Sequence, residues 1–261
     1  MDLHLKDHVA LVAGGTGGIG SATVRAFLAE GAKVAFSSIS QAEVYALLAQ
    51  EGVDPDRARG FVVDLTDEGA VAGFVRDATR AFGTIDHVVA AAGIEGTHAR
   101  ICDMDVTAFE RVYAINVFSV LMLAKHAGPV MAEKGGGSMV VLASSSAYEP
   151  IVDNSDYSSS KYAVAGLTKC IANELGPSGV HVNYVCPGCV DTAMMRRIEV
   201  SIFGEEMPHQ KAMSLVAEGT LDKRYARPEE IANAILFLSS DVTSHVAGLG
   251  LRVDSNVPGV I

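Results

Sequence analysis

Residues 9–20 of the chain, VALVAGGTGGIG, decide the fold. The stretch begins with Val9–Ala13, a short apolar run typical of a strand that is buried on both faces. A glycine-rich turn follows, and it leads directly into an amphipathic stretch over Gly20–Gly31. A strand, a glycine-rich turn and a helix in this order form the unit that receives the pyrophosphate of a dinucleotide.

The same alternation of apolar runs and amphipathic stretches continues along the chain. Further strands are predicted at Val34–Ser37, Gly60–Asp64, His87–Ala92, Ser138–Ser144, His181–Val185 and Gly250–Asp254. Helical patterns separate them at Gln41–Glu51, Asp67–Phe82 and Pro228–Leu238. This order predicts an α/β fold with a doubly wound, Rossmann-like parallel sheet and helices on both faces. Because no linker or repeat interrupts it, we expect a single domain over residues 1–261.

Two other helical stretches, Val106–Glu133 and Tyr157–Leu175, are apolar around most of their circumference. A helix of this kind must be buried on all sides, whereas packing on a sheet covers only one side. We therefore expect these two helices to pair with their symmetry mates across a two-fold axis.

The composition limits the kinds of partner. Of the 261 residues 49% are hydrophobic and 20% charged, which suits a large folded core. No window reaches about 18 uninterrupted apolar residues, so no membrane span is expected. The first residues do not form a secretory signal, which predicts a cytoplasmic protein. The net charge of −11, without a long basic run, argues against nucleic acid or an anionic membrane as the main partner.

Cys186 and Cys189 form the sequence C-P-G-C, which resembles a redox or metal motif. A zinc site would need a second pair or a histidine cluster, and neither is present. A redox pair would begin a helix after an early strand, whereas this one follows a late strand. We interpret the motif as a structural turn and expect no metal.

The glycines after the first strand suit a phosphate-binding turn. Glycine permits positive φ angles and lets a pyrophosphate approach the backbone, and the following helix offers free N–H groups. No Lys-Ser or Lys-Thr pair follows, which argues against a P-loop nucleotide site. The predicted cofactor contacts in this turn are Gly14, Thr16, Gly17, Gly18, Ile19 and Gly20.

The end of the second predicted strand should lie near the adenosine ribose. An acidic residue there would accept a hydrogen bond from the 2′-hydroxyl of NAD, and an arginine would bind the 2′-phosphate of NADP. Ser37 and Ser38, which are neither acidic nor basic, occupy this place, and Gly17 offers no cation. NAD(H) or NADP(H) both remain open, and the lack of a cation favours NAD.

Tyr157 and Lys161 stand four residues apart on one face of a predicted helix. An ammonium near the phenol would lower the tyrosine's pKa and make it a usable acid–base group. Ser144 ends the fifth predicted strand, at the sheet edge where such folds bind ligands. Its hydroxyl could hold a substrate oxygen while Tyr157 transfers a proton.

In these features the sequence resembles the short-chain dehydrogenase/reductase family in its compact form, over essentially the whole chain. The resemblance is carried by the glycine spacing at Gly14, Gly18 and Gly20, by Ser144, by the stretch YSSSKYAVAGLTK from Tyr157 to Lys169, by Asn183, and by Pro187-Gly188 followed by Thr192. It implies an oxidoreductase that transfers a hydride between a nicotinamide cofactor and a secondary alcohol or ketone. It also implies a homotetramer.

The resemblance further implies roles for individual residues. The catalytic set would be Asn116, Ser144, Tyr157 and Lys161, with Asn116 holding a water that links the lysine to solvent. Tyr157 and Lys161 would also touch the cofactor. The resemblance implies that Asp64 touches the adenine and Thr192 the nicotinamide carboxamide. Further predicted cofactor contacts are Leu65, Ala91, Gly93, Pro187, Gly188 and Val190. The chain departs from the family at Ala90-Ala91, where two asparagines are usual, at Ala13, and at Asp254-Ser255-Asn256.

Two other functions fit parts of the pattern. A non-catalytic redox sensor would keep the glycine turn without needing Tyr157, Lys161 and Ser144 together. An epimerase or dehydratase also uses tyrosine and lysine, but usually has a tighter glycine spacing and a larger C-terminal substrate domain.

By the same resemblance a lid over the substrate is expected at about residues 190–216. Its apolar residues recur at helical spacing: Met194, Met195, Ile198, Ile202 and Phe203. The opposite wall is expected at Ala147 to Val152, with Tyr148, Ile151 and Val152. This predicts an uncharged, cyclic or medium-chain secondary alcohol or its ketone. Arg196 and Arg197 could instead face inward and bind a carboxylate or phosphate.

Overall fold

The computed structural model describes residues 1–256 and contains one parallel sheet of seven strands. The strands are β1 (Val9–Ala13), β2 (Lys33–Ser38), β3 (Ala58–Val62), β4 (His87–Ala90), β5 (Gly137–Leu142), β6 (Val180–Pro187) and β7 (Gly250–Val253). Their order across the sheet is β3-β2-β1-β4-β5-β6-β7, so the direction of winding reverses between β1 and β4. This confirms the expected Rossmann-like, doubly wound fold.

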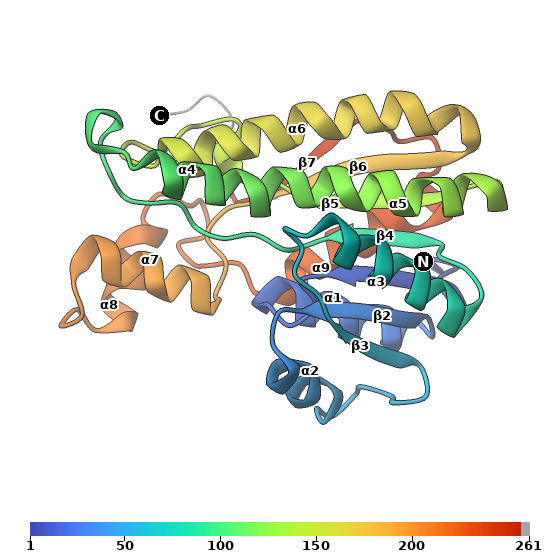
Figure 1. Cartoon of the computed structure of the whole chain (residues 1–261). Coiled ribbons are helices and arrows are strands. Elements are labelled where there is room, and N and C mark those ends of the chain that lie inside the picture. Colours follow the sequence, from blue (N-terminus) through green and yellow to red (C-terminus); the bar gives the residue numbers. More distant parts are fainter. Residues whose placement is uncertain (257–261) are drawn as a thin grey trace.

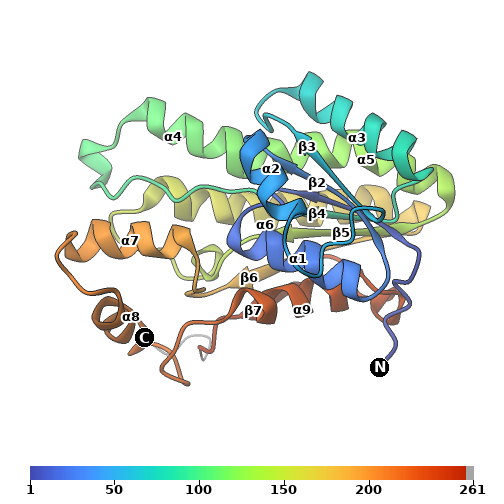
Figure 2. The ribbon, with the colours of Figure 1, turned by 90° about the horizontal axis from the view of Figure 1, so that it is seen from below.

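Helices cover both faces of the sheet (Figures 1 and 2). They are α1 (Gly18–Ala29), α2 (Gln41–Leu48), α3 (Glu68–Phe82), α4 (Val106–Tyr113), α5 (Ser119–Lys134), α6 (Ser155–Leu175), α7 (Ala193–Phe203), α8 (His209–Ala217) and α9 (Pro228–Ser239). One face is packed by α3, α5 and α6, and the other by α1, α2 and α9. Two hydrophobic cores result, one on each side of the sheet.

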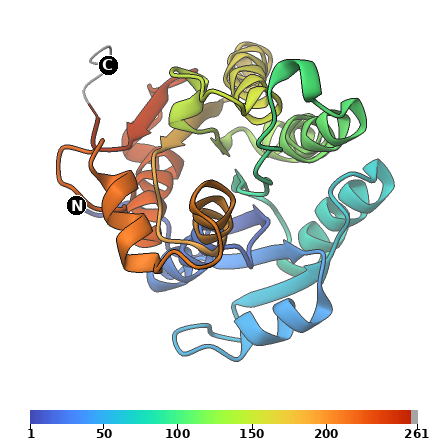
Figure 3. The same ribbon diagram turned by 90° about the vertical axis from the view of Figure 1, so that its left-hand side faces the viewer.

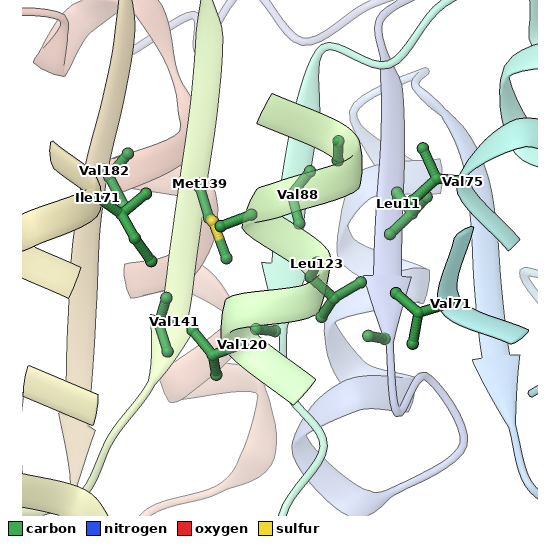
Figure 4. Packing of buried hydrophobic residues seen from close by; sticks show 14 of the residues in the cluster. Leu11, Val71, Val75, Val88, Val120, Leu123, Met139, Val141, Ile171 and Val182 are labelled. Atoms are coloured by element: carbon green, nitrogen blue, oxygen red, sulfur yellow. The ribbon is translucent and has the colours of Figure 1, made fainter. Parts of the chain in front are cut away.

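The strands supply both cores because their side chains alternate between the faces. Leu11 of β1 and Val88 of β4 point to the first core, where they meet Val120 and Leu123 of α5 (Figure 4). Val12 points to the opposite core. All five residues of β1 are buried, as the continuous apolar run predicts.

The predicted elements agree with the observed ones except at their ends. β4 and β5 were expected to end at Ala92 and Ser144 and end at Ala90 and Leu142. β3 was expected at Gly60–Asp64 and spans Ala58–Val62. The Asp64 carboxylate accepts hydrogen bonds from the backbone N–H (2.9 Å) and the hydroxyl (2.7 Å) of Thr66. This side-chain turn competes with strand pairing and ends the strand early.

The helix expected over Val106–Glu133 is interrupted in its middle. A π-helical turn over Ala114–Phe118 separates α4 from α5 and contains the buried Asn116. Such turns often occur at functional sites. By length and mean hydropathy (1.4 over its most apolar window) the stretch Val106–Lys134 could span a membrane. In this fold its inner side, including Val120 and Leu123, packs on the sheet.

The segment after β6 leaves the sheet and forms α7 and α8 before it returns. Val190 pairs with Ala226 in an isolated bridge, which joins the two ends of this excursion. In Figure 3 the two helices lie in front of the sheet. This segment contains the expected lid.

The opposite edge of the sheet, where the strands begin, carries a cluster of polar side chains that we call the amino-edge cluster: His8, Asp86, His87, Lys134 and His181. His8 Nδ1 lies 2.9 Å from His87 Nε2, and His87 Nδ1 lies 2.8 Å from the Ser138 hydroxyl. Asp86 forms an ion pair with Lys134. A cavity of about 350 Å³ borders these residues.

Candidate active site

The carboxyl ends of β1, β4, β5 and β6 bring most of the predicted site residues to one edge of the sheet. β1 pairs with β2 on one side and with β4 on the other. The helices that follow β1 and β4 lie on opposite faces of the sheet. A crevice therefore forms between the ends of these two strands, where the winding reverses. The glycine turn follows β1, Gly93 follows β4, and Ser144 follows β5.

The glycine turn has the shape that a pyrophosphate requires. Gly14 has a φ of 77°, and a Cβ there would lie 2.7 Å from the Ala92 Cα atom. A Cβ on Gly20 would lie 2.1 Å from the Gly14 carbonyl oxygen. Glycine is therefore required at both positions, while Gly17 and Gly18 are exposed at the start of α1. Free N–H groups at this helix end fit a phosphate anion.

A carboxylate that the sequence analysis missed lies at the adenosine end of the crevice. Glu43, on α2, accepts hydrogen bonds from the hydroxyls of Ser38 (2.6 Å) and Thr16 (2.8 Å). These hydrogen bonds, the one from Ser38 first, hold the pKa of Glu43 below its ordinary value. The Glu43 carboxylate thus places a negative charge between the glycine turn and the end of β2, although Ser37 and Ser38 are neutral.

Two of the predicted cofactor contacts, Asp64 and Leu65, lie just beyond β3. Asp64 is exposed, and its carboxylate is engaged by Thr66 in the turn described above. Leu65 is half-buried and packs against the core that contains α3 and α5. The contact of Asp64 with adenine and that of Leu65 with the cofactor remain predictions.

Ser144, Tyr157 and Lys161 come together where β5 ends and α6 begins. Lys161 Nζ donates a hydrogen bond to the Leu142 carbonyl (2.9 Å) and lies 5.5 Å from the centre of the Tyr157 ring. Ser144 is extended (φ −168°, ψ 160°) and accepts a hydrogen bond from the Ser146 N–H (3.1 Å). The helical spacing of four residues therefore places the amine beside the phenol, as expected.

The electrostatics of this group differ from the expectation. Burial raises the pKa of the Tyr157 phenol, and a hydrogen bond with Ser144 acts in the opposite direction. Burial also lowers the pKa of Lys161 to about 8. The prediction that the lysine lowers the tyrosine's pKa is not met, because the amine donates to a carbonyl and burial dominates both groups.

Asn116 holds the segment after β4 against α6. Its Oδ1 accepts from the Ile94 N–H (2.9 Å), and its Nδ2 donates to the Ile94 carbonyl (3.1 Å) and to the Ser160 hydroxyl (3.1 Å). A Cβ on Gly93 would lie 3.3 Å from Asn116 Oδ1 and 3.6 Å from Lys161 Nζ. The structure thus places Gly93, Asn116 and Lys161 together, with the half-buried Ala91 just before them.

The end of β6 forms the other side of the crevice. Pro187 is buried, and a Cβ on Gly188 would lie 2.8 Å from the Asp254 Cβ. Thr192 begins α7 and accepts a hydrogen bond from the Met195 N–H (3.3 Å). Its Cγ2 methyl lies so close to Gly18 that a Cβ there would be 2.5 Å away.

All four cysteines are free thiols. Burial raises the pKa of Cys186 to about 11, and burial also raises the pKa of Cys189. Protonated thiols are poor nucleophiles and metal ligands. These shifts agree with a structural C-P-G-C turn, and residues 1–256 contain no group of three or more side chains suited to a metal ion.

The two arginines of the expected lid are paired with acidic side chains. Arg196 Nη2 donates to Asp191 Oδ1 (2.7 Å). Arg197 forms a two-pronged ion pair with Glu95, in which Nη2 lies 3.0 Å from Oε2. Because Glu95 follows β4, this pair connects α7 to the opposite side of the crevice. The Glu95 carboxylate also contributes to the raised pKa of Tyr157.

The apolar residues expected to form the substrate walls are less buried than the pattern predicts. Val152 is 84% exposed and Ile202 is 53% exposed. The buried residue of α7 is Glu199, which accepts a hydrogen bond from His209 of α8 (2.6 Å between Oε2 and Nδ1). Met194, Met195, Ile198 and Phe203 are half-buried.

Comparison with known proteins gives full-length matches. A family model described as enoyl-(acyl carrier protein) reductase matches residues 13–256. Cis-4-hydroxycyclohexanecarboxylate dehydrogenase of Sinomonas cyclohexanicum is 35% identical over 256 residues, which cover 97% of this chain and 98% of that protein. The 3alpha-hydroxysteroid dehydrogenase of Mediterraneibacter gnavus is 34% identical with the same coverage.

Solved structures agree. Levodione reductase superimposes with a TM-score of 0.91 at 32% identity, covering 96% of this chain and 97% of that one. NAD⁺-bound xylitol dehydrogenase superimposes with a TM-score of 0.89 at 28% identity, covering 97% and 100%. These relatives are named as dehydrogenases and reductases, which does not support the sensor or the epimerase and dehydratase alternatives.

Proposed function

Because the chain belongs to the short-chain dehydrogenase/reductase family, we propose that it interconverts an uncharged secondary alcohol and its ketone with NAD(H). It is an oxidoreductase that acts on CH–OH groups with a nicotinamide cofactor, as its relatives are. The observation that carries the proposal is the meeting of Ser144, Tyr157 and Lys161 at the sheet edge that holds the glycine turn.

A bound nicotinamide supplies or takes the hydride. The Ser144 hydroxyl would hold the substrate oxygen, and the Tyr157 Oη would take the hydroxyl proton during oxidation and return it during reduction. Lys161, with a pKa of about 8, exists in both protonation states near neutral pH and would pass that proton onward. Asn116 would keep the segment after β4 in place, and by the family resemblance it would also hold the relay water.

The preference for NAD rests on the chemistry around the predicted ribose site. Neither the glycine turn (residues 14–20) nor the stretch from Ser37 to Glu43 contains a lysine or arginine. A 2′-phosphate would therefore bind without a cation from either segment. The similar xylitol dehydrogenase structure has NAD⁺ bound.

The proposed substrate is a cyclic or medium-chain secondary alcohol without a negative charge. Arg196 and Arg197 are each paired with an acidic side chain, so neither offers a free cation to a carboxylate. The half-buried Met194 and Met195 would give the lid an adaptable apolar surface. One relative acts on a hydroxycyclohexanecarboxylate, so the charge of the substrate needs a direct test.

We also propose a homotetramer. On α5 Phe118 is 52% and Leu121 47% exposed, and on the neighbouring α6 Tyr162 is 45% exposed. The helices expected to be buried on all sides thus leave an apolar outer face in the single chain. In Figure 1 these two helices, α5 and α6, run side by side. A second copy would cover this face. Light scattering should report a tetramer for the wild-type protein. The Leu121→Glu variant, which places a charge on this face, should form a smaller species.

The free thiols support the proposal that the enzyme works in the reducing environment of the cytoplasm. Its partners would be small molecules rather than nucleic acids or membranes, in keeping with the net charge of −11.

Activity is tested by incubating the protein with each reduced cofactor and a panel of carbonyl compounds. Oxidation of NADH that depends on a carbonyl supports the proposal. Cofactor binding without turnover would instead indicate a sensor, and conversion without net cofactor change an epimerase. Matched neutral and carboxylated alcohols then test the substrate class: a higher kcat/KM for the carboxylated series would contradict the uncharged substrate.

A further inference from the structure

We propose that Arg197 forms a carboxylate-binding site at the crevice that the protein fills with its own Glu95, so that Glu95 excludes carboxylated alcohols as substrates. The inference rests on the proposed function and assigns the preference for an uncharged substrate to one side chain.

The backbone that carries Glu95 is fixed on both sides next to the candidate catalytic group. The residue before it is held by the two hydrogen bonds of Asn116 described above. Two residues after it, the Thr97 N–H donates to Asp156 Oδ2 (2.7 Å). Asp156 is fully buried and directly precedes Tyr157. The segment is therefore attached to the start of α6, where the phenol lies, and cannot easily carry Glu95 away from it.

The Glu95 carboxylate acts on the phenol and on the lid. Burial is the main cause of the raised pKa of the Tyr157 phenol, and the charge of Glu95 adds to it. The carboxylate therefore lies within electrostatic reach of the group that would meet the substrate oxygen. Its two oxygens accept hydrogen bonds from Nε and Nη2 of Arg197 on α7, the second at 3.0 Å.

This ion pair has the geometry in which a guanidinium binds a carboxylate of any origin. Two parallel N–H groups of arginine match the two oxygens of one carboxylate, and that match is specific. Burial acts to raise the pKa of Glu95, but the hydrogen bond from Arg197 outweighs it, and the pKa is lowered. Glu95 is thus ionised at neutral pH, and a carboxylated substrate would have to displace it to reach the guanidinium.

The neighbouring arginine provides an internal comparison. Arg196 pairs with Asp191, which lies just before α7 on the same side of the crevice (2.7 Å). The Arg197 pair instead joins segments 102 residues apart in the chain, on the two sides of the crevice. The Glu95 side chain is 23% exposed, whereas that of Asp191 is 45% exposed. Arg197 is therefore the arginine of α7 that is directed toward a bound substrate.

The test compares the neutral alcohol that the wild-type enzyme oxidises best with its analogue in which a carboxylate replaces a methyl group. Wild-type protein should have the higher kcat/KM for the neutral alcohol. Glu95→Ala frees both the guanidinium and the space of the carboxylate. The ratio of kcat/KM for the charged over the neutral alcohol should therefore rise by about tenfold or more, the effect of one hydrogen bond to a charged group. The matched control Asp191→Ala frees Arg196 and should leave the ratio unchanged.

Two further variants show whether the guanidinium causes the change. In Glu95→Ala/Arg197→Gln the ratio should return to about the wild-type value. Arg197→Ala alone should lower the ratio, because Glu95 then repels the charged alcohol without a compensating cation. Both side chains are partly exposed, and thermal unfolding checks that each variant is folded. If Glu95→Ala does not fold, the direction of the change in Arg197→Ala decides.

The outcomes separate this inference from the proposed function. If the wild-type enzyme prefers the neutral alcohol and Glu95→Ala keeps the wild-type ratio, Arg197 is not a carboxylate site, while the proposed function stands. A rise in the ratio that persists in Glu95→Ala/Arg197→Gln also overturns the inference. A wild-type enzyme that prefers the charged alcohol, or that oxidises no alcohol, contradicts both.

Discussion

At the carboxyl edge of the sheet, polar side chains have hydrogen-bonding atoms that no other residue in the described part of the chain uses. At the amino edge, most polar side chains form hydrogen bonds or ion pairs with one another. Glu43 Oε1 is an unused atom of the carboxyl edge, and the Tyr157 hydroxyl, which forms a hydrogen bond with Ser144, lies at the same edge. In the amino-edge cluster His87 uses both ring nitrogens, one with His8 and one with Ser138. His181 is the exception in this cluster, because neither of its buried ring nitrogens has a hydrogen-bond partner among residues 1–256.

The size of a pKa shift does not tell the two edges apart. Burial lowers the pKa of His87 to about 3, a larger change than that of Lys161, which falls to about 8. Nor does the presence of a cavity, since one of about 350 Å³ borders the amino-edge cluster. Three features together distinguish the carboxyl edge: a glycine turn that a ligand can approach closely, a hydrogen-bond acceptor that none of residues 1–256 uses, and the Tyr157 phenol beside the Lys161 amine.

The largest effect is expected from Tyr157→Phe at the carboxyl edge. Without the phenolic hydroxyl no proton can be exchanged with the substrate, so kcat should fall by about 100-fold or more. Affinity for ADP-ribose should stay near the wild-type value, because that ligand lacks the nicotinamide and the substrate. Tyr162→Phe is the control, since Tyr162 donates only to the Tyr148 carbonyl (2.7 Å). Near-normal turnover of Tyr157→Phe would contradict the proposal that Tyr157 exchanges a proton with the substrate.

A smaller effect is expected at the amino edge, on stability rather than activity. The pKa of His87 is about 3 in the folded chain and near 6.5 when unfolded. The unfolded state therefore binds more protons between these values, and the free energy of unfolding falls as the pH drops below 6.5. At about 1.4 kcal/mol per pH unit, the loss attributable to His87 is about 2 kcal/mol at pH 5.

His87→Asn should flatten this acid slope, while turnover of the folded enzyme at pH 8 stays near wild type. Urea unfolding at several pH values measures it. His98→Asn, which makes the same change at an exposed position, should leave the slope as it is. An unchanged slope in His87→Asn would show that the amino-edge cluster does not control acid stability.

The smallest effect is expected from Glu95→Gln, at the carboxyl edge again. The Glu95 carboxylate raises the pKa of Tyr157, so its removal should lower that pKa. Oxidation needs the deprotonated tyrosine, and the pH dependence of kcat/KM for oxidation should therefore move to lower pH, by less than about one unit. Glu110→Gln on the exposed side of α4 is the control. A shift to higher pH would contradict the assigned effect of the Glu95 carboxylate on the pKa of Tyr157.

The sequence predicted the sheet because each strand is a short apolar run followed by a recognisable turn. It missed the early end of β3, since the turn at Asp64 depends on a side-chain hydrogen bond rather than on the apolar pattern. It also missed the π-helical turn at Asn116. An apolar helical pattern does not reveal where one extra residue enters the helix.

The candidate catalytic group could be predicted from the sequence because Tyr157 and Lys161 share one helix and Ser144 follows a strand. Glu43 and Glu95 could not, because each acts on a residue that is distant along the chain. The spacing of Glu43 from Ser40 suggests a capping role, and only its contacts with Ser38 and Thr16 in the folded chain show where its carboxylate lies. Glu95 forms its ion pair with Arg197, which lies 102 residues later in the chain.

The bridge between Val190 and Ala226 has a consequence for how such enzymes diversify. The segment between these two residues carries α7 and α8 and contains no strand of the sheet, so its length can change without breaking the pairing of β6 with β7. Its other contacts with the body include the ion pair of Arg197 with Glu95. The entropic cost of closing a loop rises only slowly with its length. We therefore expect that exchanging this segment, the predicted substrate lid, between relatives would change the range of substrates while the sheet stays intact.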